Sequence, residues 1–106
     1  MNVGDAFILH PEAALDITEI WECIAQDNVG AAGRVREDIL RTIRQLVGFP
    51  LQGHKRPDLT SRPLRFKVVR DYLIVYAPAE KPLLVLGVLH GRRDPRVMAA
   101  LLRGRE

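Results

Sequence analysis

Two neighbouring segments with helical periodicity constrain the folding of this chain more than any other feature. In residues 11–26, apolar side chains recur every three or four residues, which predicts a helix with one apolar face. That face comprises Ala14, Ile17, Trp21 and Ile24, and Ile20 widens it. Residues 30–48 repeat the pattern with Ala32, Val35, Ile39, Ile43 and Leu46. Because only the short link 27–30 separates them, with Asn28 as a helix cap, the two helices are predicted to form an antiparallel hairpin.

Four further segments have the composition of strands. The last of them, Leu-Leu-Val-Leu-Gly-Val-Leu-His, is apolar on both faces, which is typical of a central strand. The predicted strands are residues 3–9, 64–69, 72–77 and 83–90. Residues 49–63 form a long loop, a kind of segment that often carries function. A short helix is predicted from Asp94-Pro95 onward, followed by a tail at residues 104–106.

This order predicts an α+β fold in two layers. An amino-terminal strand and a meander of antiparallel strands form the sheet, and the helical hairpin packs against it. A length of 106 residues is that of one small domain, so residues 1–106 are predicted to be a single domain. Trp21 and the aliphatic stripes are expected in its core. Cys23 falls within an apolar helical pattern and is expected to be buried.

Charge is distributed very unevenly along the chain. Residues 1–50 contain four basic and eight acidic residues, a balance of −4, whereas residues 51–106 contain twelve and five, a balance of +7. Thirteen of the sixteen basic residues are arginine, whose planar fork binds phosphates and carboxylates. The basic half therefore favours an anionic partner, either nucleic acid or an acidic protein segment, over a merely solvated surface. A lone cysteine and an amino end interrupted by Asp5 fit a cytoplasmic protein without a signal peptide.

Several short motifs occur in the order found in one known family. They are the first-helix run Asp16–Ala25, Asn28 followed by Ala31-Ala32, Pro50 and Gly53 with Arg56, Leu59 and Arg65, Asp71-Tyr72 with Ile74-Val75-Tyr76, and Val88-Leu89-His90-Gly91-Arg92-Arg93-Asp94. Over roughly residues 12–95 the chain thereby resembles the ParE/RelE superfamily of toxins of type II toxin–antitoxin systems. The first-helix run and the ending from His90 to Asp94 carry most of this resemblance, and the ending is similar to that of the ParE branch.

The resemblance implies a toxin that a cognate antitoxin neutralises by wrapping it with an acidic carboxy-terminal segment. ParE-like members poison DNA gyrase, and RelE-like members cut messenger RNA on the ribosome. The ending favours a gyrase inhibitor that is not an enzyme. The alternatives are a metal-independent, RelE-like endoribonuclease and a non-toxic binding module of the same fold. None of these implies a cofactor, and the histidines lack the spacing of metal ligands.

A nuclease would require a general base or acid and cations at the scissile phosphate, and the candidates are His90 and Arg65. No tyrosine follows Tyr76, although RelE-like nucleases usually carry one or further basic residues near the carboxy end. His90 is therefore expected to hydrogen-bond the loop that contains Asp94, and Arg65 to bind a carboxylate of the antitoxin or of the chain itself. The residues expected to bind partners are Lys55, Arg56, Arg65, Lys67, Arg92 and Arg93.

Overall fold

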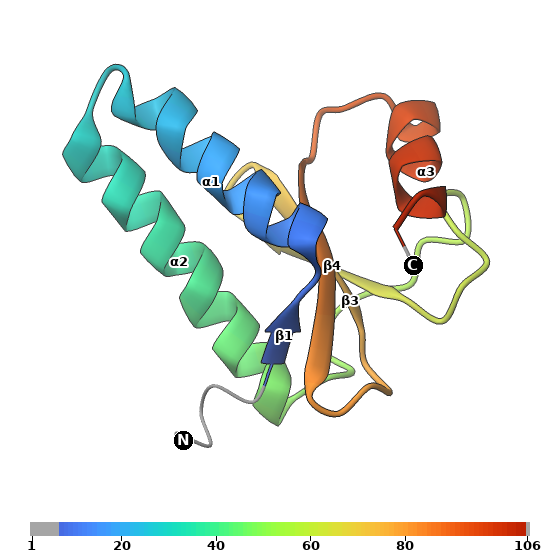
Figure 1. The fold of residues 1–106 in the computed structure, drawn as a ribbon. Helices are drawn as coiled ribbons and strands as arrows, with labels where there is room; N and C mark the ends of the chain where they lie inside the picture. The colour runs from blue at the N-terminus through green and yellow to red at the C-terminus, as the bar shows by residue number, and fades with distance from the viewer. Residues whose placement is uncertain (1–6, 106) are drawn as a thin grey trace.

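The computed structural model describes residues 7–105, and its elements follow the predicted order (Figure 1). They are β1 (Phe7–Leu9), α1 (Pro11–Ala25), α2 (Val29–Gly48), β2 (Arg65–Val69), β3 (Tyr72–Ala77), β4 (Leu83–His90) and α3 (Pro95–Arg103). Residues 3–6 of the predicted first strand lie outside the described residues. None of the described helices is long and apolar enough to cross a membrane.

The four strands form one sheet in the order β1-β4-β3-β2. β2, β3 and β4 are the predicted antiparallel meander, and β1 adds to β4 in parallel, with Phe7 opposite Leu83. β4 is therefore central, as its two apolar faces predict. Figure 1 shows α1 and α2 on one side of the sheet and α3 on the other. The predicted α+β class is confirmed.

Each helix begins at a side chain that accepts a hydrogen bond from its first turn. Asn28 accepts from the amide of Ala31 at 2.9 Å, so the predicted cap of α2 is confirmed. His10 Nδ1 accepts from Glu12 ahead of α1, and Asp94 accepts from Arg96 ahead of α3. Such caps satisfy amide donors that a helix leaves unpaired, and each typically stabilises by about 1 kcal/mol.

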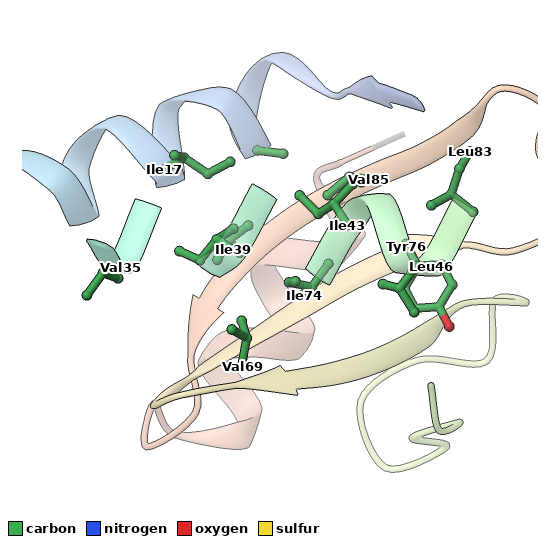
Figure 2. Close-up of a cluster of buried hydrophobic side chains, with 12 residues drawn as sticks. Ile17, Val35, Ile39, Ile43, Leu46, Val69, Ile74, Tyr76, Leu83 and Val85 are labelled. Atoms are coloured by element: carbon green, nitrogen blue, oxygen red, sulfur yellow. The ribbon is translucent and has the colours of Figure 1, made fainter. Parts of the chain in front are cut away.

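The hairpin packs its apolar stripe onto the sheet (Figure 2). Ile39, Ile43 and Leu46 of α2 are fully buried there, against Ile74 and Val85 of the sheet among others. Each such aliphatic side chain contributes about 1.5–3 kcal/mol by leaving water. The stripe of α2 is the one that its spacing predicts.

The predicted stripe of α1 is confirmed at Ile17, Ile20 and Ile24, which pack into the core, but two other predicted members do not. Ala13 is buried instead of Ala14, which is exposed, and Trp21 is half-buried at the flank instead of lying in the core. The prediction that Cys23 is buried is wrong, since its side chain is exposed. Spacing identifies a face only to within one residue on a helix as rich in alanine and isoleucine as this one, and contact with the sheet decides between the alternatives.

A second apolar cluster occupies the opposite face of the sheet. Met98 and Leu102 of α3 cover it, and Leu59 and Leu64 close its side from the long loop. Leu86 of β4 lies fully buried within it. α3 and the loop therefore seal the face that the hairpin leaves open.

Arg105 is not part of a tail, contrary to the sequence-based prediction for residues 104–106, of which Glu106 lies outside the described residues. Arg105 is only 6% exposed, and its guanidinium binds both carboxylate oxygens of Asp16 in α1, at 2.6 and 3.1 Å. The same group donates to the carbonyl of Leu86, and Asp16 also accepts from the amide of Val88. β1 pairs with β4 only as far as Val85, so this ion pair takes over the hydrogen bonds at the free edge beyond it.

The surface ion pairs of α2 are not those that its spacing favours. Side chains four residues apart on a helix would pair Arg34 with Asp38 and Glu37 with Arg41. In the structure Asp38 instead binds Arg41 at 3.0 Å and Arg70 at 2.7 Å. Arg70 lies in the turn between β2 and β3 with a φ of 53°, a left-handed conformation that glycine adopts more readily. The contact with Asp38 ties this turn to the hairpin.

Candidate functional site

His90 ends β4 and is exposed. Its Nδ1 accepts a hydrogen bond from the amide of Arg92 at 3.2 Å, and its ring lies edge-on to Tyr72 with 5.5 Å between centroids. The expectation that His90 hydrogen-bonds the loop that contains Asp94 therefore holds, with the amide of Arg92 as the donor. Since Nδ1 is an acceptor here, the neutral ring carries its proton on Nε2.

A cleft of about 310 Å³ opens beside His90, between α1 and the end of β4. Its lining is Asp16, Glu19, Ile20, Cys23, Tyr72, Val88, Leu89, His90 and Arg93. Burial raises the pKa of the Tyr72 hydroxyl above its usual value, so this group remains a hydrogen-bond donor at and well above neutral pH. The cleft thus combines an imidazole, a phenol and a guanidinium with two carboxylates, a thiol and three aliphatic side chains.

The segment after His90 holds α3 in place. Asp94 accepts from the amide of Arg96 and also pairs with the Arg96 side chain at 3.1 Å. The side-chain hydrogen bond from Arg96 lowers the pKa of Asp94, so the cap stays ionised. Arg92 and Arg93 lie exposed between His90 and this cap. They form the first of two arginine-containing surfaces, here called the β4-end surface.

Arg65 lies at the start of β2 and is engaged with the long loop. Its guanidinium donates to the carbonyl of Gly53 at 2.8 Å and lies 3.5 Å from that of Leu51. The sequence predicts that Arg65 binds a carboxylate, either of the antitoxin or of the chain itself. Within the chain, Arg65 binds backbone carbonyls and not a carboxylate. Since carbonyl groups are neutral, the positive charge of Arg65 is not cancelled by this contact.

The register of the sheet separates His90 from Arg65. His90 lies opposite Tyr72 of β3, and Arg65 lies opposite Tyr76. Those two positions are four steps apart along β3, which is about 13 Å at the usual rise of a strand. The two candidate catalytic residues therefore lie towards opposite ends of the sheet.

The other predicted cations group around Arg65. Lys67 follows it on the same face of β2, and Lys55 and Arg56 lie in the loop before it. Arg56 pairs with Asp58 through two hydrogen bonds of 2.9 and 2.7 Å, and the side-chain hydrogen bond lowers the pKa of Asp58. Lys55, Arg56, Arg65 and Lys67 are here called the loop surface. The six predicted partner-binding residues therefore form two separate groups.

Sequence reasoning missed the residues that tie the distant segments together. Arg62 donates to the carbonyls of Leu102 and Arg105 at 3.0 and 2.7 Å, and so binds the end of α3 to the long loop. The Asp16–Arg105 pair joins residues 89 positions apart. No local pattern in the sequence marks such pairs.

The order of elements, the antiparallel meander and the short terminal helix are those of the ParE/RelE fold. A family model described as the ParE toxin of type II toxin–antitoxin system, parDE, matches residues 7–95. Since this match spans most of the sequence, the chain belongs to the ParE toxin family and is a toxin of the type II toxin–antitoxin kind, with an antitoxin as its implied partner. A comparison with curated proteins finds no match.

Proposed function

We propose that the chain inhibits DNA gyrase by binding it, and that a cognate antitoxin blocks this action. The observation that carries the choice of target is the separation of His90 from Arg65 along β3. A nuclease must bring its base and its cations to the same phosphate. About 13 Å of strand between the two candidates does not favour that chemistry. A binding protein has no such requirement.

The β4-end surface is the proposed contact with gyrase. Arg92 and Arg93 are exposed there, and neither forms an ion pair within residues 7–105. Their backbone is held between the His90 hydrogen bond and the Asp94 cap. Cations positioned in this way suit an acidic surface of a partner protein.

The loop surface and the nearby edge of β2 are the proposed contacts with the antitoxin. The amide and carbonyl of Phe66 exchange hydrogen bonds with His54 on the outer side of β2. Val68, two residues further, directs its amide and carbonyl to the same side, and its side chain is 63% exposed. An extended acidic segment can therefore add to this edge beside Lys67.

Supercoiling by purified gyrase, measured at increasing concentrations of the chain, tests the target. We expect inhibition that depends on dose, and at least about tenfold weaker inhibition for Arg92→Gln/Arg93→Gln. Arg34→Gln is the matched control, because Arg34 is an exposed arginine of α2 that is not part of the β4-end surface. Unchanged supercoiling without any trapped cleavage complex would reject the proposal.

Ribosome-dependent cleavage of a transcript tests the nuclease alternative. We expect the transcript to remain intact. Cleavage that disappears in His90→Ala would overturn gyrase as the target and establish the RelE-like activity. His90→Ala is more informative than Arg65→Ala, because Arg65 also holds the loop at Gly53. Normal growth on expression of verified folded chain without antitoxin would instead favour a non-toxic binding module.

The antitoxin is expected from the reading frame beside that of the chain. Copurification of that product with the chain, across a series of salt concentrations, tests the partnership. We expect the affinity of the chain for the antitoxin to fall as salt rises. The unneutralised cations of the loop surface attract acidic side chains, and salt screens this attraction. We place the pair in the cytoplasm, where gyrase acts.

A further inference from the structure

Two large apolar side chains project from the segment that follows α2. Phe49 is 69% exposed and Leu51 is 68% exposed, the highest values among the large hydrophobic residues of the described chain. They flank Pro50, and a shallow hollow of about 490 Å³ lies over residues 48–52. A single exposed apolar side chain is ordinary, whereas neighbouring ones beside a hollow often mark an interaction site.

The backbone that carries these side chains is held firmly from beneath. The Tyr76 hydroxyl accepts from the amide of Gly53 at 2.9 Å and donates to the carbonyl of Pro50 at 2.7 Å. Tyr76 is itself fully buried, and Figure 2 shows its ring beside Leu46 with the hydroxyl at the margin of the cluster. Arg65 adds its hydrogen bond to Gly53 from β2.

Gly53 fits this arrangement because it has no side chain. A Cβ at that position would lie 2.6 Å from the Tyr76 oxygen and 2.9 Å from the carbonyl oxygen of Phe66. The loop is therefore anchored closely to the sheet, while its two apolar side chains point to solvent. A loop ordered before binding avoids part of the entropy cost of association.

The cations near this loop differ in whether a carboxylate neutralises them. Arg41, Arg44 and Arg56 each pair with a carboxylate of the chain, that of Asp38, Glu37 and Asp58 respectively. Within the described residues 7–105, neither Lys55 nor Lys67 forms an ion pair, and Arg65 binds only carbonyls. An apolar centre with unneutralised cations at its rim is complementary to an acidic segment that carries apolar residues.

We propose that Phe49 and Leu51 form the principal anchor for the acidic segment of the antitoxin. An apolar side chain of that segment packs between them, and its carboxylates reach Lys55 and Lys67. This inference rests on the proposed antitoxin partnership and adds to it a location separate from the β4-end surface. Antitoxin binding and target binding then use different parts of the toxin.

The test uses the complex of the full chain with the product of the neighbouring reading frame. Affinity is measured by calorimetry for the wild type and for Phe49→Ala/Leu51→Ala. We expect a loss of at least about 30-fold, the size of effect that defines an interface hot spot. Leu15→Ala is the matched control, since Leu15 is a 48% exposed leucine on α1, and we expect it to change affinity by about twofold at most. Because all three side chains are exposed, thermal melts should show each variant folded.

A second measurement locates the contact directly. Amide exchange in residues 48–54 is compared between the free chain and the complex, and we expect slower exchange in the complex for amides that contact the antitoxin. Compared with the wild type, Lys55→Glu should bind the antitoxin clearly more weakly at low salt and only slightly more weakly at high salt.

The outcomes separate the two proposals. If the wild-type chain forms no complex with that product, both the partnership and this anchor are rejected. If the complex forms and the double variant binds as tightly as the wild type, the anchor alone is refuted. If the double variant instead converts a dimer of the free chain to a monomer while antitoxin affinity is unchanged, the patch joins two copies and the inference is also refuted.

Discussion

Arg105→Met is expected to destabilise the fold by about 3–5 kcal/mol, the usual cost of removing one partner from a buried ion pair. The side chains of Arg105 and Asp16 are only 7% and 14% exposed, so water cannot fully solvate the carboxylate left behind. Methionine retains most of the volume of the arginine stem, which limits the effect of a cavity. Charge and hydrogen bonding therefore account for most of the expected loss.

Three hydrogen bonds disappear together in this variant. Two join the guanidinium to Asp16, and the third, of 3.2 Å, joins it to the carbonyl of Leu86. An unsatisfied buried acceptor costs about 1–3 kcal/mol by itself. Asp16→Asn should cost less than Arg105→Met, because an amide oxygen can still accept from Val88. The double variant should be more stable than the sum of the single losses predicts, since neither charge then remains unpaired.

Urea unfolding followed by the fluorescence of Trp21, the single tryptophan, measures this loss. A thermal melt should fall by at least about 12 °C, given roughly 4–8 °C for each kcal/mol in a domain of this size. Arg103→Met is the control, because Arg103 is exposed at the end of α3. A free energy of unfolding within about 0.5 kcal/mol of the wild type would refute the reasoning, since it is the change expected of an ordinary surface substitution.

Three further predictions concern the loop and the ion pairs. Tyr76→Phe should accelerate amide exchange at Gly53 and destabilise by about 1–3 kcal/mol, because it removes the hydroxyl that holds the loop. Burial raises the pKa of Tyr76. The stabilisation that its protonated hydroxyl gives the fold is therefore complete below the ordinary tyrosine pKa of about 10 and is lost as pH rises through the higher pKa of the folded state. The free energy of unfolding of Tyr76→Phe should therefore depend less on alkaline pH than that of the wild type, and an identical dependence would contradict this. Gly53→Ala should destabilise by about 1–3 kcal/mol in urea, because the carbonyl of Phe66 cannot easily move away, and an unchanged midpoint would count against it. The hydrogen bond from Arg70 lowers the pKa of Asp38. The stabilisation that the Asp38 carboxylate gives the fold is therefore present above the ordinary carboxyl range and is lost as pH falls through the lowered pKa. The free energy of unfolding of Asp38→Asn should depend less on acid pH than that of the wild type, and equal slopes would contradict this.

The candidate site could be predicted only in part. The individual cations were identifiable, because a basic second half with so many arginines is visible in the sequence. Their division into a loop surface and a β4-end surface was not, since it depends on which residues of β3 lie opposite Arg65 and His90. Pairing register is a property of two strands together. The exposed Phe49 and Leu51 resemble ordinary core residues in the sequence, and only the buried Tyr76 beneath their loop explains why they point outward.

The sequence by itself determined the elements of this toxin and the helix face of α2. Spacing of three and four residues, the Asn28 cap and the fully apolar β4 act through neighbours along the chain, so each can be read locally. The tertiary structure alone decided that Arg105 closes the fold on Asp16, that α1 buries Ala13 in place of Ala14, and that His90 and Arg65 face different ends of the sheet. These outcomes depend on contacts between segments far apart in the sequence, where the shape and register of the packed sheet select the partner.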